Sequence, residues 1–428
     1  YTMNPSTAGD MYNTAVGATA GNLLTTGTLN TLVGGLSGDA LTTGAENVAV
    51  GYMALSADDL GNHSVAIGAS ALVAQNYSTA TDSFNTAVGS FTGAAITTGI
   101  HNTLMGRAAG DALTDADYNV AIGKDALGAD TLGSRSVAIG QESLSAQNFT
   151  TATETYNVGV GFYAGKSVTT GTGNTFVGGL AGDGTDDGSN NTAVGLAALS
   201  ANCGSSNVAM GYFALVANTA SSNTAIGTSA GAAVTSGANN TFVGAFAGDK
   251  TDDGNNCTAV GYLSLGANCG SDNTAFGAHA LAASTGIDNT AIGSQAGDAQ
   301  DAGSNNSFLG HDAGRSGSPG GAVSTGDNQV CIGDENITHA HIQVDWTIAS
   351  DQRDKTDFTA LDLGLDFVKE LSPVTYRWDK RSKYGDKTAD DYDLADQTPD
   401  GTHKEDWLDI GFKAQEVEAL EKSAGYKI

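Results

Sequence analysis

The sequence is poor in the residues that build one large globular core. Its 428 residues include only 4 prolines, and aromatic residues make up 7% of the chain. So little bulk argues against a single large core, and a chain this regular is not expected to be disordered. An elongated repeat domain is therefore expected.

Basic residues and long apolar runs are also scarce. Lys and Arg number 18 against 47 Asp and Glu, which gives a formal net charge of −29. This charge argues against a nucleic-acid partner, because nucleic-acid affinity depends on clustered Lys and Arg. No apolar run is long enough to span a bilayer, which predicts no membrane insertion. The chain opens with neither Met nor a signal peptide, so we expect it to be a piece of a longer polypeptide.

Cysteine is rare and follows no known site pattern. Cys203, Cys257, Cys269 and Cys331 form no CxxC pair, and no histidine stands at metal-ligand spacing. The sequence therefore predicts no disulfide framework and no cofactor. Cys203 and Cys269 share the context ANCGS. We interpret the four cysteines as small, buried positions of a repeat.

Glycine, by contrast, is abundant and marks a short repeat. The pentad NTAVG at 13–17 is the first of eighteen related copies, and a degenerate copy, QVCIG, stands at 329–333. The closing glycines of successive copies lie roughly 16 to 21 residues apart, a period that predicts a β-solenoid with one coil per copy. A coil of this length suits two short strands and two turns. β-Branched residues and alternation place the pentad on a strand, and its glycine in a turn.

The second half of each coil is equally regular. After the pentad glycine come two variable residues, then Ala, Ser or Thr, then Gly or Leu. This last position runs Gly, Gly, Leu, Leu along the chain, so the larger unit is a block of four coils. The third pentad residue is large only in coils with the later Gly, which predicts that large and small side chains share one close-packed cavity. These large residues are Leu32, Leu104, Phe176, Phe242 and Phe308.

The first pentad residue is Asn in fifteen of the eighteen copies. Stacked coils would align these residues about 4.8 Å apart, the spacing at which Asn side chains form ladders. Asn also suits a turn in the left-handed conformation. Both interpretations are structural.

The repeat resembles the head repeat of trimeric autotransporter adhesins, which builds a parallel β-roll from three chains, and similar segments occur in phage tail fibres. The resemblance covers residues 13 to about 333 through the pentad and the GxxA[GL] step. A hexapeptide β-helix is the alternative, but it needs several apolar steps per coil and this repeat shows one strict step.

Two surface features are candidate contact sites. The segments AQNYSTATDSFN (74–85) and AQNFTTATETYN (146–157) lengthen two coils and carry aromatic residues that either contact a glycan or protein or fold back onto the solenoid. The segments GDGTDDG (182–188) and GDKTDDG (248–254) offer oxygen ligands for a divalent cation, although Asp and Gly also suit tight turns. Because their spacing matches neither an EF-hand nor the nonapeptide calcium repeats, we predict no metal. The aspartates concerned are Asp183, Asp186, Asp187, Asp249, Asp252 and Asp253.

The composition changes after about residue 334, where a separate domain is expected. Twelve of the 18 Lys and Arg and all three Trp lie beyond it. We expect a connecting strand at 334–349 and a helix that ends before Pro373. A strand at 374–378 follows, and 406–422 is predicted to run from a strand into a helix.

This region resembles the endosialidase-type intramolecular chaperone domain that ends many tailspikes and tail fibres. The carrying motifs are SDQRDK at 350–355, SPVTYRW at 372–378 and GFKAQEVE at 411–418. The resemblance implies a homotrimer, cleavage of the Ser350–Asp351 bond, Ser350 as nucleophile and Lys355 as its general base. Attack by Ser350 on its own carbonyl would form a strained ring, so a neighbouring chain or an activated water remains open. Helix capping by Ser350, Asp351 and Lys355 is the structural alternative.

These resemblances predict residues 1–12 as a lead-in, 13–333 as the solenoid shaft and 350–428 as a chaperone domain that ends short of the family's helical arms. The predicted function is a trimeric virion fibre at the phage tail, outside the cell, with autoproteolysis as its sole reaction. Its expected partners are a host surface receptor, either glycan or protein, and other tail proteins bound through a region before Tyr1. A bacterial surface adhesin is the alternative. A polysaccharide-cutting spike is disfavoured, because its paired carboxylates need a cleft.

Overall fold

The computed structural model describes residues 11–318, 321–338, 364–379, 398–404 and 406–423. The chain divides into two units, Tyr1–Ala340 and His341–Ile428, which are treated separately below. Within the described residues, no helix has both the length and the apolar character needed to cross a membrane.

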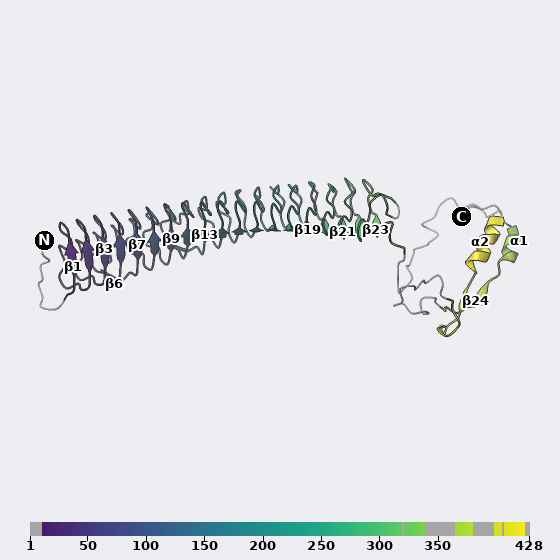
Figure 1. Cartoon of the computed structure of the whole chain (residues 1–428), viewed down its shortest axis with the longest axis horizontal. Coiled ribbons are helices and arrows are strands. Elements are labelled where there is room, and N and C mark those ends of the chain that lie inside the picture. The colour runs from purple at the N-terminus through teal and green to yellow at the C-terminus, as the bar shows by residue number, and fades with distance from the viewer. Residues whose placement is uncertain (1–10, 319–320, 339–363, 380–397, 405, 424–428) are drawn as a thin grey trace. The chain divides into compact units, whose positions relative to one another are not determined.

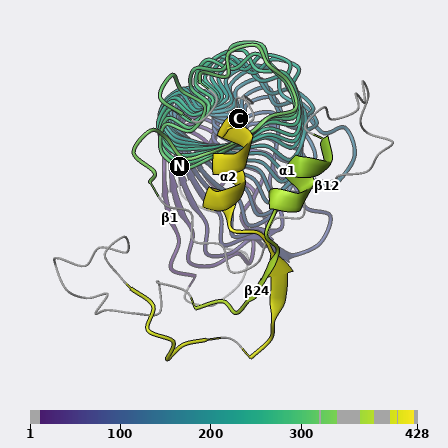
Figure 2. The same ribbon diagram turned by 90° about the vertical axis from the view of Figure 1, so that its right-hand side faces the viewer.

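The first unit is a parallel β-solenoid whose coils follow one another in sequence order (Figure 1). Viewed end on, successive coils overlie one another (Figure 2). Each pentad contributes a three-residue strand to one 19-stranded sheet, and equivalent pentad positions pair between coils, as Thr175 pairs with Thr192. The predicted repeat solenoid is thus confirmed. The strands of this sheet are β1 (Thr14–Val16), β2 (Thr31–Val33), β3 (Val48–Val50), β5 (Val65–Ile67), β7 (Thr86–Val88), β8 (Thr103–Met105), β9 (Val120–Ile122), β11 (Val137–Ile139), β13 (Val158–Val160), β14 (Thr175–Val177), β15 (Thr192–Val194), β16 (Val208–Met210), β17 (Thr224–Ile226), β18 (Thr241–Val243), β19 (Thr258–Val260), β20 (Thr274–Phe276), β21 (Thr290–Ile292), β22 (Ser307–Leu309) and β23 (Val330–Ile332).

The prediction of a second strand in every coil is wrong. In the described coils, two-residue strands outside the main sheet occur only at the two extended segments. There β4 (Gly61–Asn62) pairs with β6 (Thr81–Asp82), and β10 (Gly133–Ser134) pairs with β12 (Thr153–Glu154). Residues just after the pentad have positive φ in all eighteen coils, such as Met53 at 57°, including the coils that carry these short strands. These left-handed residues curve the chain directly after the main strand. Backbone hydrogen bonds between coils continue through these turns.

The pentad glycines form a column in which neighbouring backbones touch. Gly34 has a φ of 138°, and a Cβ atom on it would lie 2.4 Å from the carbonyl oxygen of Gly51 in the next coil. Neither that φ nor that distance permits a side chain. The same close approach recurs from coil to coil, so glycine is required by the stacking itself.

In the interior, large side chains at the third pentad position lie against glycines, as the sequence predicts. Phe176 is fully buried, and a Cβ atom on Gly182 of the same coil would lie 2.5 Å from its ring. A Cβ atom on Gly165 of the preceding coil would lie 2.8 Å from the same ring. The compensation therefore spans two coils, which explains why glycine coils come in pairs.

The pentad asparagines form a ladder, which decides between the two interpretations of this position. Asn47 N donates to Asn30 Oδ1 at 3.0 Å, and Asn30 Nδ2 donates to the carbonyl of Gly44 in its own coil at 2.9 Å. Both side chains are fully buried. The left-handed conformation belongs to the preceding residue, such as Glu46 with a φ of 59°. Each asparagine thus closes its own coil and joins it to the next.

The described part of the second unit contains a small antiparallel sheet and two helices. Helix α1 (Gly364–Glu370) is followed by β24 (Val374–Tyr376), which pairs with β25 (Asp409–Gly411), and α2 (Ala414–Ser423) comes last. The predicted helix before Pro373 and the predicted strand–helix order after it are confirmed within the described residues. The connecting strand expected up to residue 349 lies mostly outside them.

Replacing Gly34 with Ala should destabilise the solenoid, whereas the same change at Gly35 should have little effect. Gly35 has no positive φ, and a Cβ atom there would meet only Tyr52 at 3.6 Å and the carbonyl oxygen of Ala18 at 4.0 Å. We expect Gly34→Ala to lower the free energy of unfolding by about 3 kcal/mol. Thermal unfolding followed by circular dichroism measures both variants. Equal midpoints would contradict the backbone contact.

Candidate functional site

The residue directly before each pentad forms a surface column, and part of this column is aromatic and charged. These residues have positive φ, and most of the aromatic ones are well exposed, such as Tyr118 at 47% and Tyr156 at 57%. Six consecutive coils place His63, Phe84, His101, Tyr118, Arg135 and Tyr156 here, and we call this set the aromatic column.

The side chains of the aromatic column stack along the solenoid. The ring centroids of His63 and Phe84 are 4.9 Å apart, and those of His101 and Tyr118 are also 4.9 Å apart, with interplanar angles of 5° and 7°. Phe84 and His101 lie 5.2 Å apart, and the Arg135 guanidinium lies 4.9 Å from the centroid of the Tyr118 ring. These spacings follow the distance between coils. Because the ring faces cover one another, mainly ring edges face solvent.

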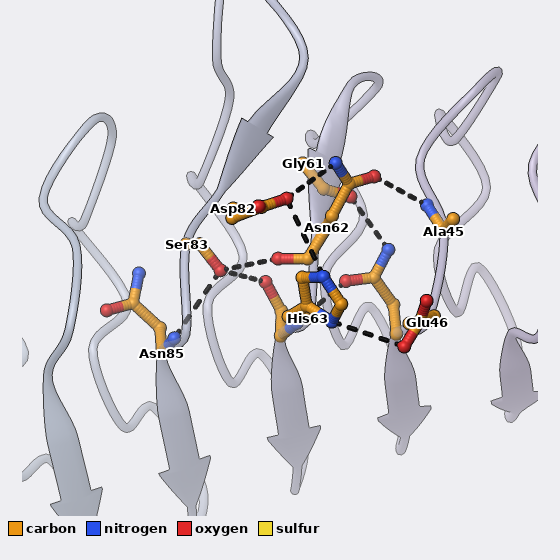
Figure 3. Close-up of polar contacts among 10 residues, drawn as sticks. Ala45, Glu46, Gly61, Asn62, His63, Asp82, Ser83 and Asn85 are labelled. Atoms are coloured by element: carbon orange, nitrogen blue, oxygen red, sulfur yellow. Dashed lines mark hydrogen bonds and ion pairs between the residues drawn. The ribbon is translucent and has the colours of Figure 1, made fainter.

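Carboxylates flank the aromatic column. The His63 ring lies between Glu46 and Asp82, with Nδ1 3.4 Å from Glu46 Oε2 and Nε2 3.6 Å from Asp82 Oδ1 (Figure 3). Arg135 Nε lies 3.0 Å from Glu154 Oε1. The hydroxyl of Tyr156 and the guanidinium of Arg135 hold the pKa of Glu154 below its usual value. The column thus combines edge-exposed rings with fixed charges of both signs.

The aromatic column was missed from the sequence because it stands one place before the repeat that defines the coil. In later coils the same position holds mainly Asn, Ser or Asp, so the aromatic set is confined to the first half of the solenoid. The signal is visible once the sequence is aligned on its pentads. The later residues are Gly173, Asn190, Ser206, Ser222, Asn239, Asn256, Asp272, Asp288, Asn305 and Asn328.

The two extended segments divide their aromatic residues between the interior and the surface. Tyr77 is 4% exposed, and its hydroxyl donates to the carbonyl of Gly99 at 2.9 Å. Phe149 is likewise buried, whereas Phe84 and Tyr156 belong to the aromatic column. Folding back onto the solenoid is therefore confirmed for Tyr77 and Phe149, whereas contact of the exposed Phe84 and Tyr156 with a glycan or protein stays a prediction.

A buried polar network anchors each extended segment. Asp58 is fully buried, and its carboxylate accepts hydrogen bonds from Gln75 Nε2 at 2.7 Å and Gly61 N at 3.0 Å. At the second extended segment, Gln147 Nε2 donates to the buried Asp130 at 2.6 Å. Burial raises the pKa of both carboxyl groups. No local pattern in the sequence marks these two aspartates as interior residues.

The six aspartates weighed as metal ligands are not brought together. Asp183 accepts a hydrogen bond from Ser200, Asp186 from Thr169 and Asp252 from Thr235, each between coils. Asp249 has a raised pKa because of burial, and Asp187 and Asp253 are exposed. None of the six belongs to a group of three converging ligand atoms among the described residues.

One other group of possible ligands does converge within the described residues. It consists of His311, Asp312 and Asp334. Arg315 Nη1 lies 2.9 Å from Asp312 Oδ1, and Asn336 donates to both oxygens of Asp334 at 3.0 Å. The carboxylates are thus already hydrogen-bonded.

Ser350, Asp351 and Lys355 lie outside the described residues, so their roles stay predictions. Residues 350–426 match the family model described as chaperone of endosialidase. A search of curated proteins finds no match for the chain. The C-terminal resemblance to the chaperone family is therefore supported by the family comparison, whereas the resemblance of the solenoid to adhesin heads stays an inference from its repeat.

The buried aspartates predict a specific pH dependence of stability. A folded-state pKa above the ordinary value of 3.8 means that the folded chain binds these protons more tightly than the unfolded chain. Their contribution is fully present below pH 3.8 and is lost as pH rises through the folded pKa. Relative to Asp58→Asn/Asp130→Asn, the wild type should therefore lose thermal stability as pH rises from below 3.8 towards neutrality.

Thermal unfolding of both proteins across this range measures the difference. Asp58→Asn and Asp130→Asn alone should each remove part of this pH-dependent difference in stability. The two parts should add up to the effect of the double variant, because the sites lie far apart. A difference that grows in favour of the wild type as pH rises would contradict the assignment.

Proposed function

We propose that this chain is a virion fibre, a tail fibre or tailspike used in host attachment, with a C-terminal self-cleaving chaperone. The observation that carries the proposal is a long parallel β-solenoid followed directly by a match to the chaperone of endosialidase at 350–426. In this proposal residues 13–333 form the shaft, residues 334–349 form the connection and residues 350–428 form the chaperone domain. The fibre belongs to the virion tail and acts outside the cell.

A continuous apolar stripe on the solenoid supports a homotrimer. The fourth residue of each pentad is Val, Ile, Met, Leu or Phe, and none of these is buried in the described strands. Exposed fractions reach 59% at Val16 and 48% at Ile292. An apolar stripe of this length is not expected on an isolated soluble chain. Because the stripe repeats with the coil, parallel copies in register would cover it completely.

The described part of the second unit supports assembly as well. Ile410 on β25 is 80% exposed, and Trp407, Leu408 and Phe412 are each more than half exposed. Large apolar side chains gathered in one short stretch are typical of an interface that a partner covers. A trimerising chaperone domain would bury them against its own copies.

The aromatic column is the proposed contact for the host receptor. Aromatic and arginine side chains are enriched at recognition surfaces, and this column presents both beside fixed carboxylates. Either a glycan or a protein receptor fits this chemistry. Binding to other tail proteins through a region before Tyr1 belongs to the same proposal.

Self-cleavage is proposed to occur at the Ser350–Asp351 bond. Ser350 is the nucleophile, and Lys355 removes its proton when partial burial lowers its pKa. Asp351 completes the motif. Either the attacked carbonyl belongs to a neighbouring chain, or an activated water attacks in place of Ser350.

Ile226→Asp should weaken the trimer, whereas Ser222→Asp should not. Ile226 lies on the apolar stripe at 41% exposure. Its replacement loses about 1.5–3 kcal/mol of apolar burial in each copy and places a charge in the interface. Ser222 is exposed outside the stripe, at a position where other coils have Asp272 and Asp288. Light scattering after size-exclusion chromatography measures the assembly. A trimer retained equally by both variants would place the interface elsewhere.

Ser350→Ala should abolish self-cleavage. Intact mass spectrometry over hours after expression should show a fragment ending at Ser350 in the wild type and an uncut chain in the variant. Light scattering on the variant separates cleavage from trimer formation. An uncut chain in both proteins would remove the catalytic assignment and leave the fibre proposal standing.

A further inference from the structure

One coil of the solenoid holds two cysteines that face each other. Cys257 occupies the first pentad position, directly before β19, and Cys269 lies in the second turn of the same coil. Their Sγ atoms are 3.9 Å apart, and the residues are 0% and 1% exposed. No other pair of cysteines in the described residues is placed this way.

An earlier coil provides a natural comparison for this pair. Asn191 and Cys203 stand at the same two positions of their coil, one four-coil block before Cys257 and Cys269. Asn191 Nδ2 donates to the carbonyl of Gly204 at 2.9 Å, as the Cys257 thiol does to that of Gly270 at 3.2 Å. The Sγ atom of the second-turn cysteine lies 3.3 Å from a Thr hydroxyl in both coils. The two sites therefore differ mainly by Cys in place of Asn.

The exchange of Asn for Cys gives up an interaction that the comparison coil retains. An Asn at this position accepts a backbone hydrogen bond from the next coil through Oδ1, as Asn191 does from Asn207 N at 2.9 Å. A cysteine has no side-chain oxygen to offer in its place. What the coil gains is a second thiol next to the first.

The environment of the pair favours thiol chemistry. The hydrogen bond with Cys269 and burial raise the pKa of Cys257, and the same hydrogen bond lowers the pKa of Cys269. With the two Sγ atoms 3.9 Å apart, either thiol can lose its proton while the other stays protonated. A thiolate beside a protonated thiol is the arrangement from which dithiols enter disulfide exchange.

We propose that Cys257 and Cys269 are a redox-sensitive clasp, a dithiol under reducing conditions that a low-molecular-weight disulfide oxidises to an intracoil disulfide. One cysteine loses its proton, and its thiolate attacks one sulfur of the oxidant, which forms a mixed disulfide and releases the first thiolate of the oxidant. The other cysteine then loses its proton and attacks the sulfur of the first cysteine, which releases the second thiolate. Two protein thiols are oxidised and one disulfide is reduced to two thiols.

The geometry allows the bond with a small movement. A disulfide needs its sulfurs at about 2.05 Å, so each Sγ atom must move by roughly 1 Å. The first sulfur is fixed to the strand sheet and the second to a turn, and turns adjust more readily than paired strands. Closure would tie the turn to β19 across the coil and oppose opening of the solenoid at this place.

Thiol counting on the folded full chain tests the clasp. The protein is incubated with oxidised glutathione over a series of temperatures up to its unfolding midpoint, quenched with acid, denatured and alkylated. Intact mass should show that two of the four thiols are lost without retained glutathione. Chymotrypsin cuts after Tyr262, between the cysteines, and should yield two peptides joined through Cys257 and Cys269.

Two variants keep the test decisive. Cys257→Asn restores the residue of the comparison coil, and its three thiols should all remain. Asn191→Cys recreates the pair in that coil and should lose four of its five thiols. The wild type should also unfold at a higher temperature when oxidised, and Cys257→Asn should not.

Four alkylated thiols in the wild type at every temperature would overturn the proposal. A stable mixed disulfide on Cys269, or a bond to Cys203 or Cys331, would do so as well. Loss of two thiols in Cys257→Asn would place the reactive pair elsewhere.

Discussion

The contact between stacked pentad glycines is the constraint on which the rest of the solenoid depends. With a carbonyl oxygen 2.4 Å from where the Cβ atom of Gly34 would be, neighbouring coils are as close as a polypeptide backbone allows. That closeness fixes the register, and the register turns every repeat position into a column along the chain. The asparagine ladder, the shared interior, the apolar stripe and the aromatic column all follow from it.

Once the register is fixed, the chemistry of a column is set by one residue per coil. Interior columns tolerate few changes, because their side chains already fill the available space. The Phe176 ring, for example, leaves no room for a Cβ atom on either of the two glycines that it contacts. Outer columns are free to vary, so the position before the pentad is aromatic in one half of the solenoid and polar in the other. The same scaffold thus separates the residues that hold it together from those available to partners.

The sequence predicted what depends on local pattern. It predicted the coils, the pentad strand, the exchange of Phe for Gly in the interior and the elements around Pro373. It missed what depends on the shape of a coil. The turn after each pentad contains residues such as Met53 that adopt positive φ without being glycine, and no residue type marks that position. The contacts of Cys257 with Cys269 and of His63 with Phe84 join residues that are distant along the chain, and only a folded coil brings them together.

The pairing of glycine coils has a consequence for the length of the solenoid. Each Phe or Leu at the third pentad position needs a glycine in its own coil and one in the coil before it. Loss of a single glycine coil would set such a side chain against a leucine, whereas loss or gain of a whole four-coil block preserves the order of glycine and leucine coils. The glycine pairing therefore favours changes of solenoid length in steps of one block.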